Sequence, residues 1–175
     1  MQNHTPSDPL APTIAWFSSV TAGYSDSEDR MWLKLVSADR EVVVWATRRL
    51  LTALLSQAEQ FLRGENAEED WIAKHAQAVA PFLDRGGDKP PAKPDSVKDR
   101  AQPVGLAHEI QLSRKGDRYL FIFKTGQGPF GVPCSEAESH CLLELIYQRS
   151  LTSGWDPRIH WVRQNPTAKE SPNDL

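Results

Sequence analysis

The sequence predicts an α+β fold in which a unit of three antiparallel strands followed by a helix, a βββα unit, occurs twice in tandem. Two stretches 88 positions apart, residues 29–55 and 117–143, align without a gap. Each contains two strand-like segments joined by a short turn-forming segment. Each then continues with a hydroxyl residue and an apolar stripe of helical spacing. The order strand, turn, strand, cap and helix is therefore the same in both.

The two stretches share few identical residues. Five of the aligned pairs are identical, namely Asp29/Asp117, Arg30/Arg118, Val44/Val132, Leu54/Leu142 and Leu55/Leu143. Any β-hairpin followed by a helix would align its apolar positions in this way, because the periods of the two structures force the same pattern. The gap-free offset and the Asp-Arg pair at both starts favour a duplication.

The first unit is expected to begin with a strand over residues 13–20, which are rich in aromatic and β-branched side chains. Residues 21–29 are polar and predict a loop. In the strand that follows, Met31, Leu33 and Leu35 alternate with polar or aromatic residues and should face the core. The opposite face of this strand carries Arg30, Trp32 and Lys34.

The next strand is expected over residues 41–45, and its counterpart in the second unit over residues 129–133. Pro129 and Pro133 have no N–H group to donate to a ladder. The second strand of this pair should therefore be short or lie at an edge of the sheet.

A helix should follow in each unit. Thr47 and Ser135 occupy equivalent positions at the helix starts, and Glu138 completes a capping box with Ser135. The apolar stripe of the first helix continues to residues 61–62, whereas Arg149 interrupts that of the second. Each helix should still pack on a sheet.

An extra helix is predicted over residues 67–83, where Pro81 should end or kink it. Residues 85–105 contain four prolines and alternating charges, which predicts a flexible linker. The first unit with the extra helix thus spans residues 13–84 and the second unit residues 106–163, with a strand over 108–113 and a final one over 158–162. Residues 1–12 and 164–175 are expected to be disordered arms.

Composition limits the class of protein. The net charge is −3 and the pI about 5.9, which argues weakly against a polyanionic partner. Residues 1–84 carry 7 basic and 12 acidic side chains, a net of −5, and residues 101–163 carry 7 and 6, a net of +1. The sequence contains neither an apolar run long enough to cross a bilayer nor a secretory signal pattern. These features predict a soluble, cytoplasmic protein without a membrane partner.

Motifs for catalysis or metal binding are missing from the sequence. It contains no glycine-rich phosphate loop, no GxSxG and no HExxH. Cys134, His140 and Cys141 lack the spacing of a structural zinc site, and a buried or half-exposed thiol is the favoured interpretation of Cys134. We therefore predict no cofactor, metal or catalytic residue, and an enzyme is the less favoured class.

Cations and an aromatic residue on the expected outer strand faces and at the first helix start form a candidate binding set. Single-stranded nucleic acid is bound by cations that contact phosphates and aromatic planes that stack on bases. The candidate residues are Arg30, Trp32, Lys34, Arg48, Arg49, Arg114, Lys115, Arg118 and Lys124. Leu120 and Ile122 share the outer face of the second unit, which suggests that protein covers it.

In outline, two tandem units of strands followed by a helix resemble the Whirly, PC4 and PUR-repeat proteins. This resemblance implies binding of single-stranded nucleic acid on a curved sheet. Those repeats have four strands, and none of their characteristic residues is found in this sequence, so no site residue is carried over.

Two functions are consistent with these observations. The favoured one is a non-catalytic binding or assembly protein that presents a sheet face or a helix pair to a protein partner or to a second copy. The alternative is a single-stranded nucleic-acid binding protein that uses the outer face of residues 30–34.

Overall fold

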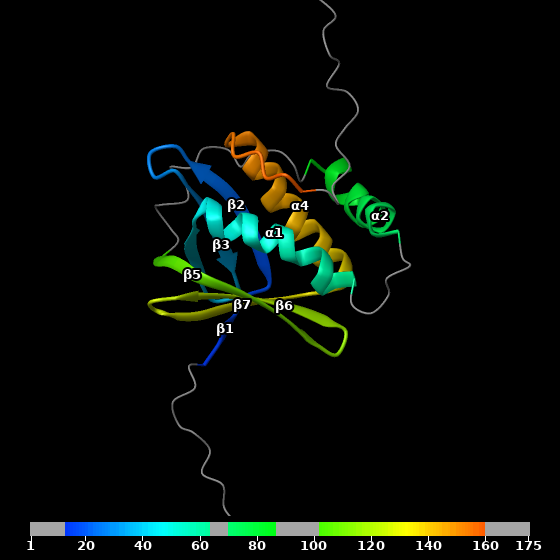
Figure 1. Cartoon of the computed structure of the whole chain (residues 1–175). Helices are drawn as coiled ribbons and strands as arrows, with labels where there is room; N and C mark the ends of the chain where they lie inside the picture. Colours follow the sequence, from blue (N-terminus) through cyan, green and yellow to red (C-terminus); the bar gives the residue numbers. More distant parts are fainter. Residues whose placement is uncertain (1–12, 64–69, 87–101, 160–175) are drawn as a thin grey trace, which may run out of the picture.

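The computed structural model describes residues 13–63, 70–86 and 102–159. These residues form a mixed seven-stranded sheet with three helices (Figure 1). The strands are β1 (Ala15–Trp16), β2 (Ser19–Ser25), β3 (Arg30–Val36), β4 (Glu41–Ala46), β5 (Gln102–Lys115), β6 (Arg118–Thr125) and β7 (Gly128–Cys134). The helices are α1 (Arg48–Arg63), α2 (Trp71–Asp84) and α4 (Glu136–Thr152). The predicted α+β class is confirmed.

The strand order in the sheet is β1-β7-β6-β5-β4-β3-β2. Strands β2 to β4 form one antiparallel group and β5 to β7 another. Parallel pairing of β4 with β5 joins the two groups. The two strand groups therefore share one sheet instead of forming two.

The sheet curls until its two ends lie close to each other. Strands β1 and β2 stand at opposite ends of the order, although only Phe17 and Ser18 separate them in the chain. The Phe17 N–H donates to the Gly131 carbonyl of β7, and the Ser18 N–H donates to the Val36 carbonyl of β3, both at 2.9 Å. Two consecutive residues thus connect the chain to both ends of the sheet.

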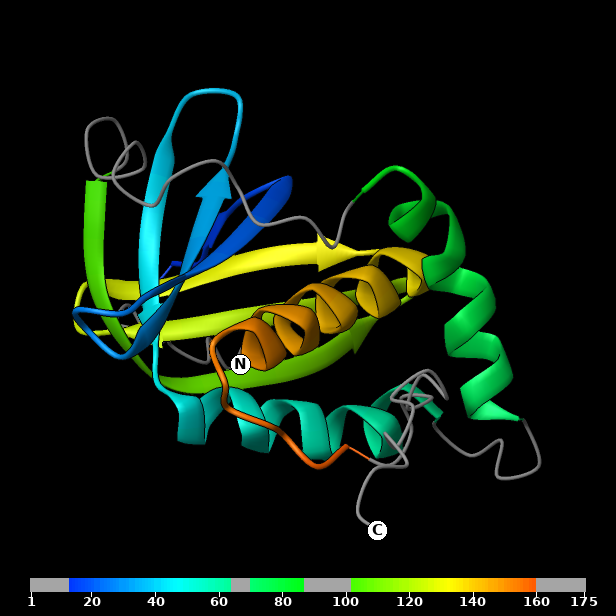
Figure 2. The same cartoon turned by 90° about the horizontal axis from the view of Figure 1, so that it is seen from above.

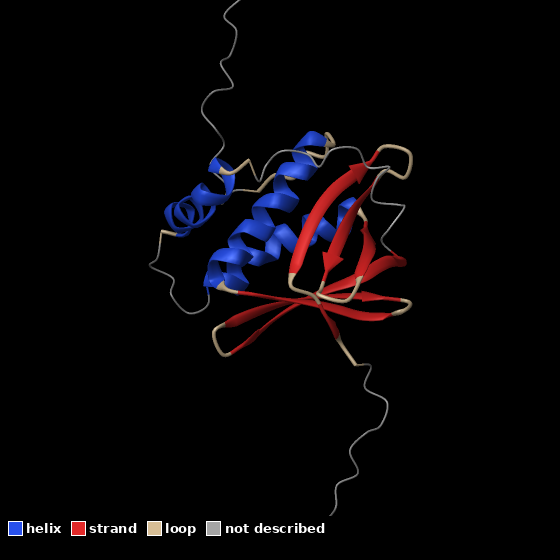
Figure 3. Cartoon of the chain, turned by 180° about the vertical axis from the view of Figure 1, so that it is seen from behind, coloured by secondary structure: helices blue, strands red, loops and turns tan. Residues whose placement is uncertain are grey.

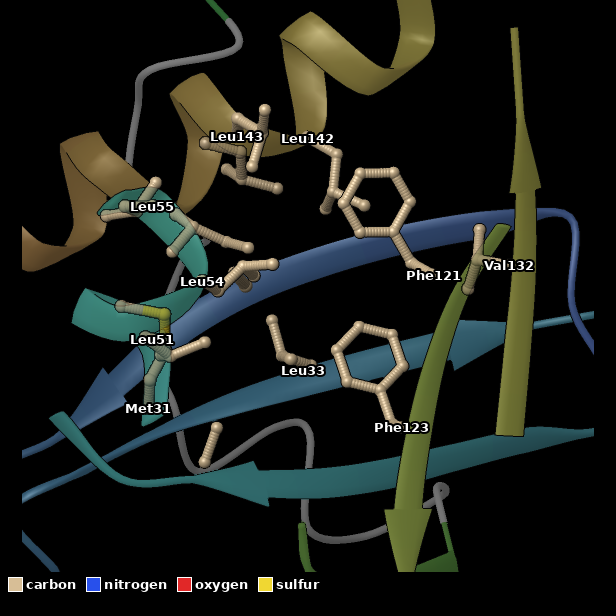
Figure 4. Packing of buried hydrophobic residues seen from close by; sticks show 14 of the residues in the cluster. Met31, Leu33, Leu51, Leu54, Leu55, Phe121, Phe123, Val132, Leu142 and Leu143 are labelled. Atoms are coloured by element: carbon tan, nitrogen blue, oxygen red, sulfur yellow. The ribbon is translucent and has the colours of Figure 1, made fainter. Parts of the chain in front are cut away.

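The core fills the inner side of this curved sheet, where α1 and α4 lie (Figure 3). Met31, Leu33 and Leu35 of β3 are each 0% exposed, which confirms their predicted inward direction. Figure 4 shows Phe121 and Phe123 of β6 pointing into the core, Phe121 towards Leu142 of α4 and Phe123 towards Leu33 of β3. The alternation of each strand therefore supplies one wall of the core.

Helix α4 is buried on nearly all sides. It packs against the sheet, α1 and α2, and ten of its residues are buried. Its capping box is present: the Ser135 hydroxyl accepts from the Glu138 N–H, and the Glu138 carboxylate accepts from the Ser135 N–H. Arg149, which interrupts the apolar stripe, is only 3% exposed and donates to the Ala22 carbonyl of β2. Arg149 thus forms a hydrogen bond to the backbone of β2 at a position where an apolar side chain would only pack.

Helix α2 lies beside the first half of α4 (Figure 2). It begins at Trp71, after Asp70, whose carboxylate accepts from the Ala73 N–H, and it continues past Pro81 to Asp84. Pro81 therefore lies within the last turn and does not end the helix, although a proline removes one hydrogen bond and crowds the preceding turn.

The strands differ from expectation at several ends. Residues 21–25 belong to β2, so the loop predicted over 21–29 is shorter. The strand expected over 108–113 extends over Gln102–Lys115, since its first part pairs with β4 and its second with β6. Residues 158–159 are not in a strand, and the rest of the predicted final strand lies outside the described residues.

Candidate functional site

The face of the sheet opposite α1 and α4, here called the outer face, is not covered by a helix in the described part of the chain (Figures 1 and 3). Side chains at alternate positions of β5, β6 and β7 point to it. Strand register places these residues in rows. The rows are Lys115–Arg118, Ser113–Leu120–Pro133, Gln111–Ile122–Gly131 and Glu109–Lys124–Pro129.

Trp16 extends the row of Ile122 and Gly131 at the end of the sheet. It is the register partner of Gly131, and its ring lies directly on this glycine. A Cβ atom at position 131 would lie 2.4 Å from the Trp16 ring and 2.8 Å from Ile14, so only glycine permits this approach. Trp16 nevertheless stays 46% exposed, the largest value among the described large apolar residues.

A hollow of about 310 Å³ lies next to these residues. Its lining comes from three strands and from the residue before β1: Ile14, His108, Gln111, Ile122, Lys124, Thr125, Gly128 and Pro129. The hollow thus has apolar walls with a few polar groups at its rim.

Three of the four predicted cations of the second unit lie on this face. Lys124 pairs with Glu109 at 2.7 Å and Arg118 with Glu138 at 3.3 Å, both at exposed positions. Lys115 is exposed beside Arg118. Arg114 points to the other side of the strand, where its guanidinium lies 5.3 Å from the centre of the Tyr119 ring.

The outer face of the first unit is organised differently. Trp32 lies on Gly23 and is only 3% exposed, next to Val43 and Trp45. Its indole nitrogen is buried and has no hydrogen-bond partner among the described residues. In this conformation the Trp32 ring is not available for stacking on a base, which the nucleic-acid hypothesis requires of it.

The remaining predicted cations do not form one basic surface with Lys115, Arg118 and Lys124. Arg30 is exposed, and Lys34 lies 3.9 Å from Glu41. Arg48 donates to the Trp155 carbonyl at 2.6 Å. Arg49 is exposed at the start of α1. The nine residues therefore lie on two outer strand faces, on an inner strand face and at a helix start.

The contact between Trp16 and Gly131 was not predicted from the sequence. The available signal was Gly131, since a glycine within a strand often marks the close approach of another group. Its partner Trp16 is 115 positions away in the chain, so the sequence offered no local indication of what approaches it.

The two cysteines line a second, mainly apolar hollow of about 220 Å³ between α2, α4 and the ends of β2 and β7. Burial raises the pKa of Cys134 to about 12 and also raises the pKa of Cys141. Both side chains are therefore neutral thiols near pH 7. The described residues include no group of three or more His, Cys, Asp or Glu side chains that could hold a metal ion.

Comparisons with protein-family models, with curated proteins and with solved structures found no match to this chain. None of the described helices is long and apolar enough to span a bilayer.

Proposed function

We propose that this chain is a non-catalytic protein-binding module that receives a partner on the outer face of β6 and β7, beside Trp16. The observation that carries the proposal is the position of Trp16. Its ring is seated on Gly131 and is 46% exposed, and Ile14 and Ile122, which also adjoin Gly131, line the hollow of about 310 Å³. Tryptophans in such positions are enriched among residues that dominate binding energy.

The apolar part of this face is larger than a single side chain. Leu120, Pro129 and Pro133 are half-buried on it, around the nearly buried Ile122. Scattered apolar residues are normal on a protein surface, but a contiguous apolar patch with a polar rim is typical of an interaction site.

The ends of the sheet are poorly suited to strand addition, which leaves the face as the better surface. Pro129 and Pro133 cannot donate from β7, and the Gly131 carbonyl between them is already bonded to Phe17. On β2, the carbonyl of Ala22 is occupied by Arg149 of α4. An incoming strand would therefore lack several of its backbone partners.

The proposed partner is a protein segment that offers one bulky apolar side chain and, farther along the segment, carboxylates. The apolar walls of the hollow suit the side chain. Lys115 and Arg118, exposed at one end of the same face, suit the carboxylates, although Arg118 would exchange Glu138 for them. Complementary charge of this kind favours specificity and association rate more than affinity.

The same proposal includes the tandem duplication. At the offset of 88 positions, β3 corresponds to β6, β4 to β7 and α1 to α4, nearly end to end. The inward residues Met31, Leu33 and Leu35 correspond to Tyr119, Phe121 and Phe123, all buried. The outer faces of the two units would then have diverged after the duplication: the buried Trp32 ring fills the first, and the second is exposed beside Trp16.

We also keep the cytoplasmic location as part of the proposal. Cys134 and Cys141 are both free thiols, and free thiols are the usual state in reducing compartments. A binding module of this kind needs no cofactor.

A random linear peptide library displayed against the full chain tests the proposed function. Enriched peptides are synthesised with a fluorophore and titrated by polarisation against the wild type and Trp16→Ala. We expect Trp16→Ala to weaken binding about 30-fold, which corresponds to roughly 2 kcal/mol for a central tryptophan. Leu151→Ala is the matched control, because Leu151 is 40% exposed but lies at the end of α4.

Several outcomes would oppose the proposal. Enriched peptides that bind Trp16→Ala as tightly as the wild type would place the site elsewhere. A failure to enrich any peptide, together with salt-sensitive binding of a dT oligonucleotide, would favour the nucleic-acid alternative. If the wild type dimerises and Trp16→Ala does not, the occupant is a second copy of the chain.

A further inference from the structure

The contact between α2 and α4 has a polar centre. Trp71, His75 and Val79 lie four residues apart on one face of α2 and are all buried. They face α4, where His140 and Glu144 are 0% and 3% exposed. His75 thus occupies the middle of a contact whose ends are apolar.

Three hydrogen bonds connect these side chains. His75 Nδ1 lies 3.0 Å from His140 Nδ1, and His75 Nε2 lies 2.9 Å from the Glu144 carboxylate. The other oxygen of Glu144 accepts from Gln148 at 2.7 Å. The Trp71 ring packs against His140, with centroids 4.7 Å apart.

These contacts limit how many protons the two imidazoles hold. A carboxylate only accepts, so the His75 Nε2 atom must carry a proton. The bond between the two Nδ1 atoms requires one proton, which belongs to either ring. The pair is therefore neutral or carries one positive charge. A second charge would put protons on both Nδ1 atoms, abolish the bond and place two cations in contact.

Other charged or titratable side chains among the described residues lie near the cluster on α2 and α4. Lys74 of α2 pairs with Glu136 of α4 at 2.7 Å, which leaves a neutral pair at the rim. Burial raises the pKa of Cys141 and of Tyr147, so both remain uncharged. The guanidinium of Arg85 beyond the end of α2 is always ionised. Among the described residues, His75 and His140 are therefore the side chains whose proton count the docked contact limits.

We propose that docking of α2 on α4 is proton-linked, and that the second proton taken up by the His75–His140 pair releases α2. The free imidazoles bind two protons, whereas the docked pair accepts one. Docking therefore weakens as the pH falls through the range in which imidazole titrates.

Release of α2 would change the surface of the molecule. Phe82 of α2 is one wall of the hollow of about 220 Å³, and Cys141, Leu142 and Leu145 of α4 form part of its floor. The Cys141 thiol also donates to the Ala78 carbonyl of α2. Acidification would therefore uncover an apolar face of α4 that α2 covers at neutral pH. This regulation is independent of the outer-face site.

Hydrogen exchange of the full chain, followed by mass spectrometry, tests the proposal. Exchange of the α2 amides is measured at pH 7 and pH 5 and corrected for the intrinsic effect of pH. Imidazoles of undocked α2 and α4 with the ordinary pKa of about 6.5 can take up one proton more than the docked pair. This difference predicts that protection of α2 falls about 25-fold from pH 7 to pH 5. Protection of α1 should stay the same, which separates release of α2 from global unfolding.

His140→Asn provides the decisive variant. An asparagine amide can donate to or accept from His75 Nδ1 but does not titrate. We expect α2 in this variant to change its protection less than about twofold between pH 7 and pH 5, against the 25-fold change of the wild type. His108→Asn is the matched control, because His108 is exposed on β5, and it should keep the response of the wild type.

A second measurement needs no variant. Long-range proton–nitrogen spectra of the imidazoles at pH 7 should show a protonated Nε2 on His75. Wild-type α2 protection that is constant between pH 7 and pH 5, or that falls together with that of α1, would overturn the proposal. Protection that depends on added Zn²⁺ and disappears with a chelator would also overturn it, in favour of a metal bound between the two Nδ1 atoms.

Discussion

Replacement of Gly23 by alanine should destabilise the protein, because Trp32 lies directly on this glycine. A Cβ atom at position 23 would stand 2.1 Å from Cζ2 and 2.5 Å from Cε2 of the Trp32 ring. Carbon atoms pack at about 3.5 to 4.0 Å, so the ring would have to move by more than about 1 Å. Trp32 is only 3% exposed and has little space for this movement.

The expected loss of unfolding free energy in Gly23→Ala is the difference between two opposing contributions. Overpacking a buried site costs about 1 to 3 kcal/mol. Loss of glycine's freedom in the unfolded chain offsets about 0.4 to 1 kcal/mol of this. We expect a net loss of roughly 1 to 2 kcal/mol, which corresponds to a Tm lower by about 2 to 8 °C for a chain of this length.

Urea unfolding of a double-mutant cycle measures this loss and its cause. In a Trp32→Leu background the alanine has no indole ring to displace, so Gly23→Ala should cost much less there than in the wild type. Gly126→Ala is the matched control, because a Cβ at this turn position meets no atom within 4 Å. If Gly23→Ala is as stable as the wild type, or if it costs the same in the Trp32→Leu background, the Trp32 ring does not exclude a side chain at position 23.

Two further substitutions test other parts of the fold by urea unfolding. Arg149→Met removes the buried N–H that donates to the Ala22 carbonyl at 3.1 Å and should lower the free energy of unfolding by about 1 to 3 kcal/mol. The control Arg49→Met, at an exposed position, should change it by less than about 0.5 kcal/mol. Equal stabilities of the two variants would mean that the Ala22 carbonyl does not need the arginine. Asp29 accepts from the Tyr24 hydroxyl at 2.6 Å and from the Trp155 indole at 3.4 Å, and these bonds hold its pKa below the ordinary value. The ionised Asp29 carboxylate therefore stabilises the protein at pH values above the ordinary pKa of aspartate, and this contribution is lost as the pH falls through the lowered pKa of the folded state. Asp29→Asn should therefore lose less of its unfolding midpoint between pH 6 and pH 2 than the wild type or Asp26→Asn, and an unchanged pH profile would contradict this assignment.

The candidate surface was only partly predictable. Lys115, Arg118 and Lys124 were expected on an outer strand face, and the register places Lys124 at the hollow and Lys115 and Arg118 at the other end of the same strands. The residue on which the proposed function rests, Trp16, was not singled out, and Trp32, which was, is buried. A period-two pattern states which side of a strand a residue faces, but not whether something lies on top of it.

Local chemistry by itself determined the inner side of the fold. The alternation of Met31, Leu33 and Leu35 and the capping box of Ser135 depend on residues at most four positions apart, so they were visible in the sequence. Tertiary structure alone decided the features that join distant residues. These are the contact of Trp16 with Gly131, the bond from Arg149 to Ala22 and the pairing of His75 with His140 and Glu144. Their partners are 65 to 127 positions apart in the chain, and only the closure of the sheet and the packing of α2 on α4 bring them together.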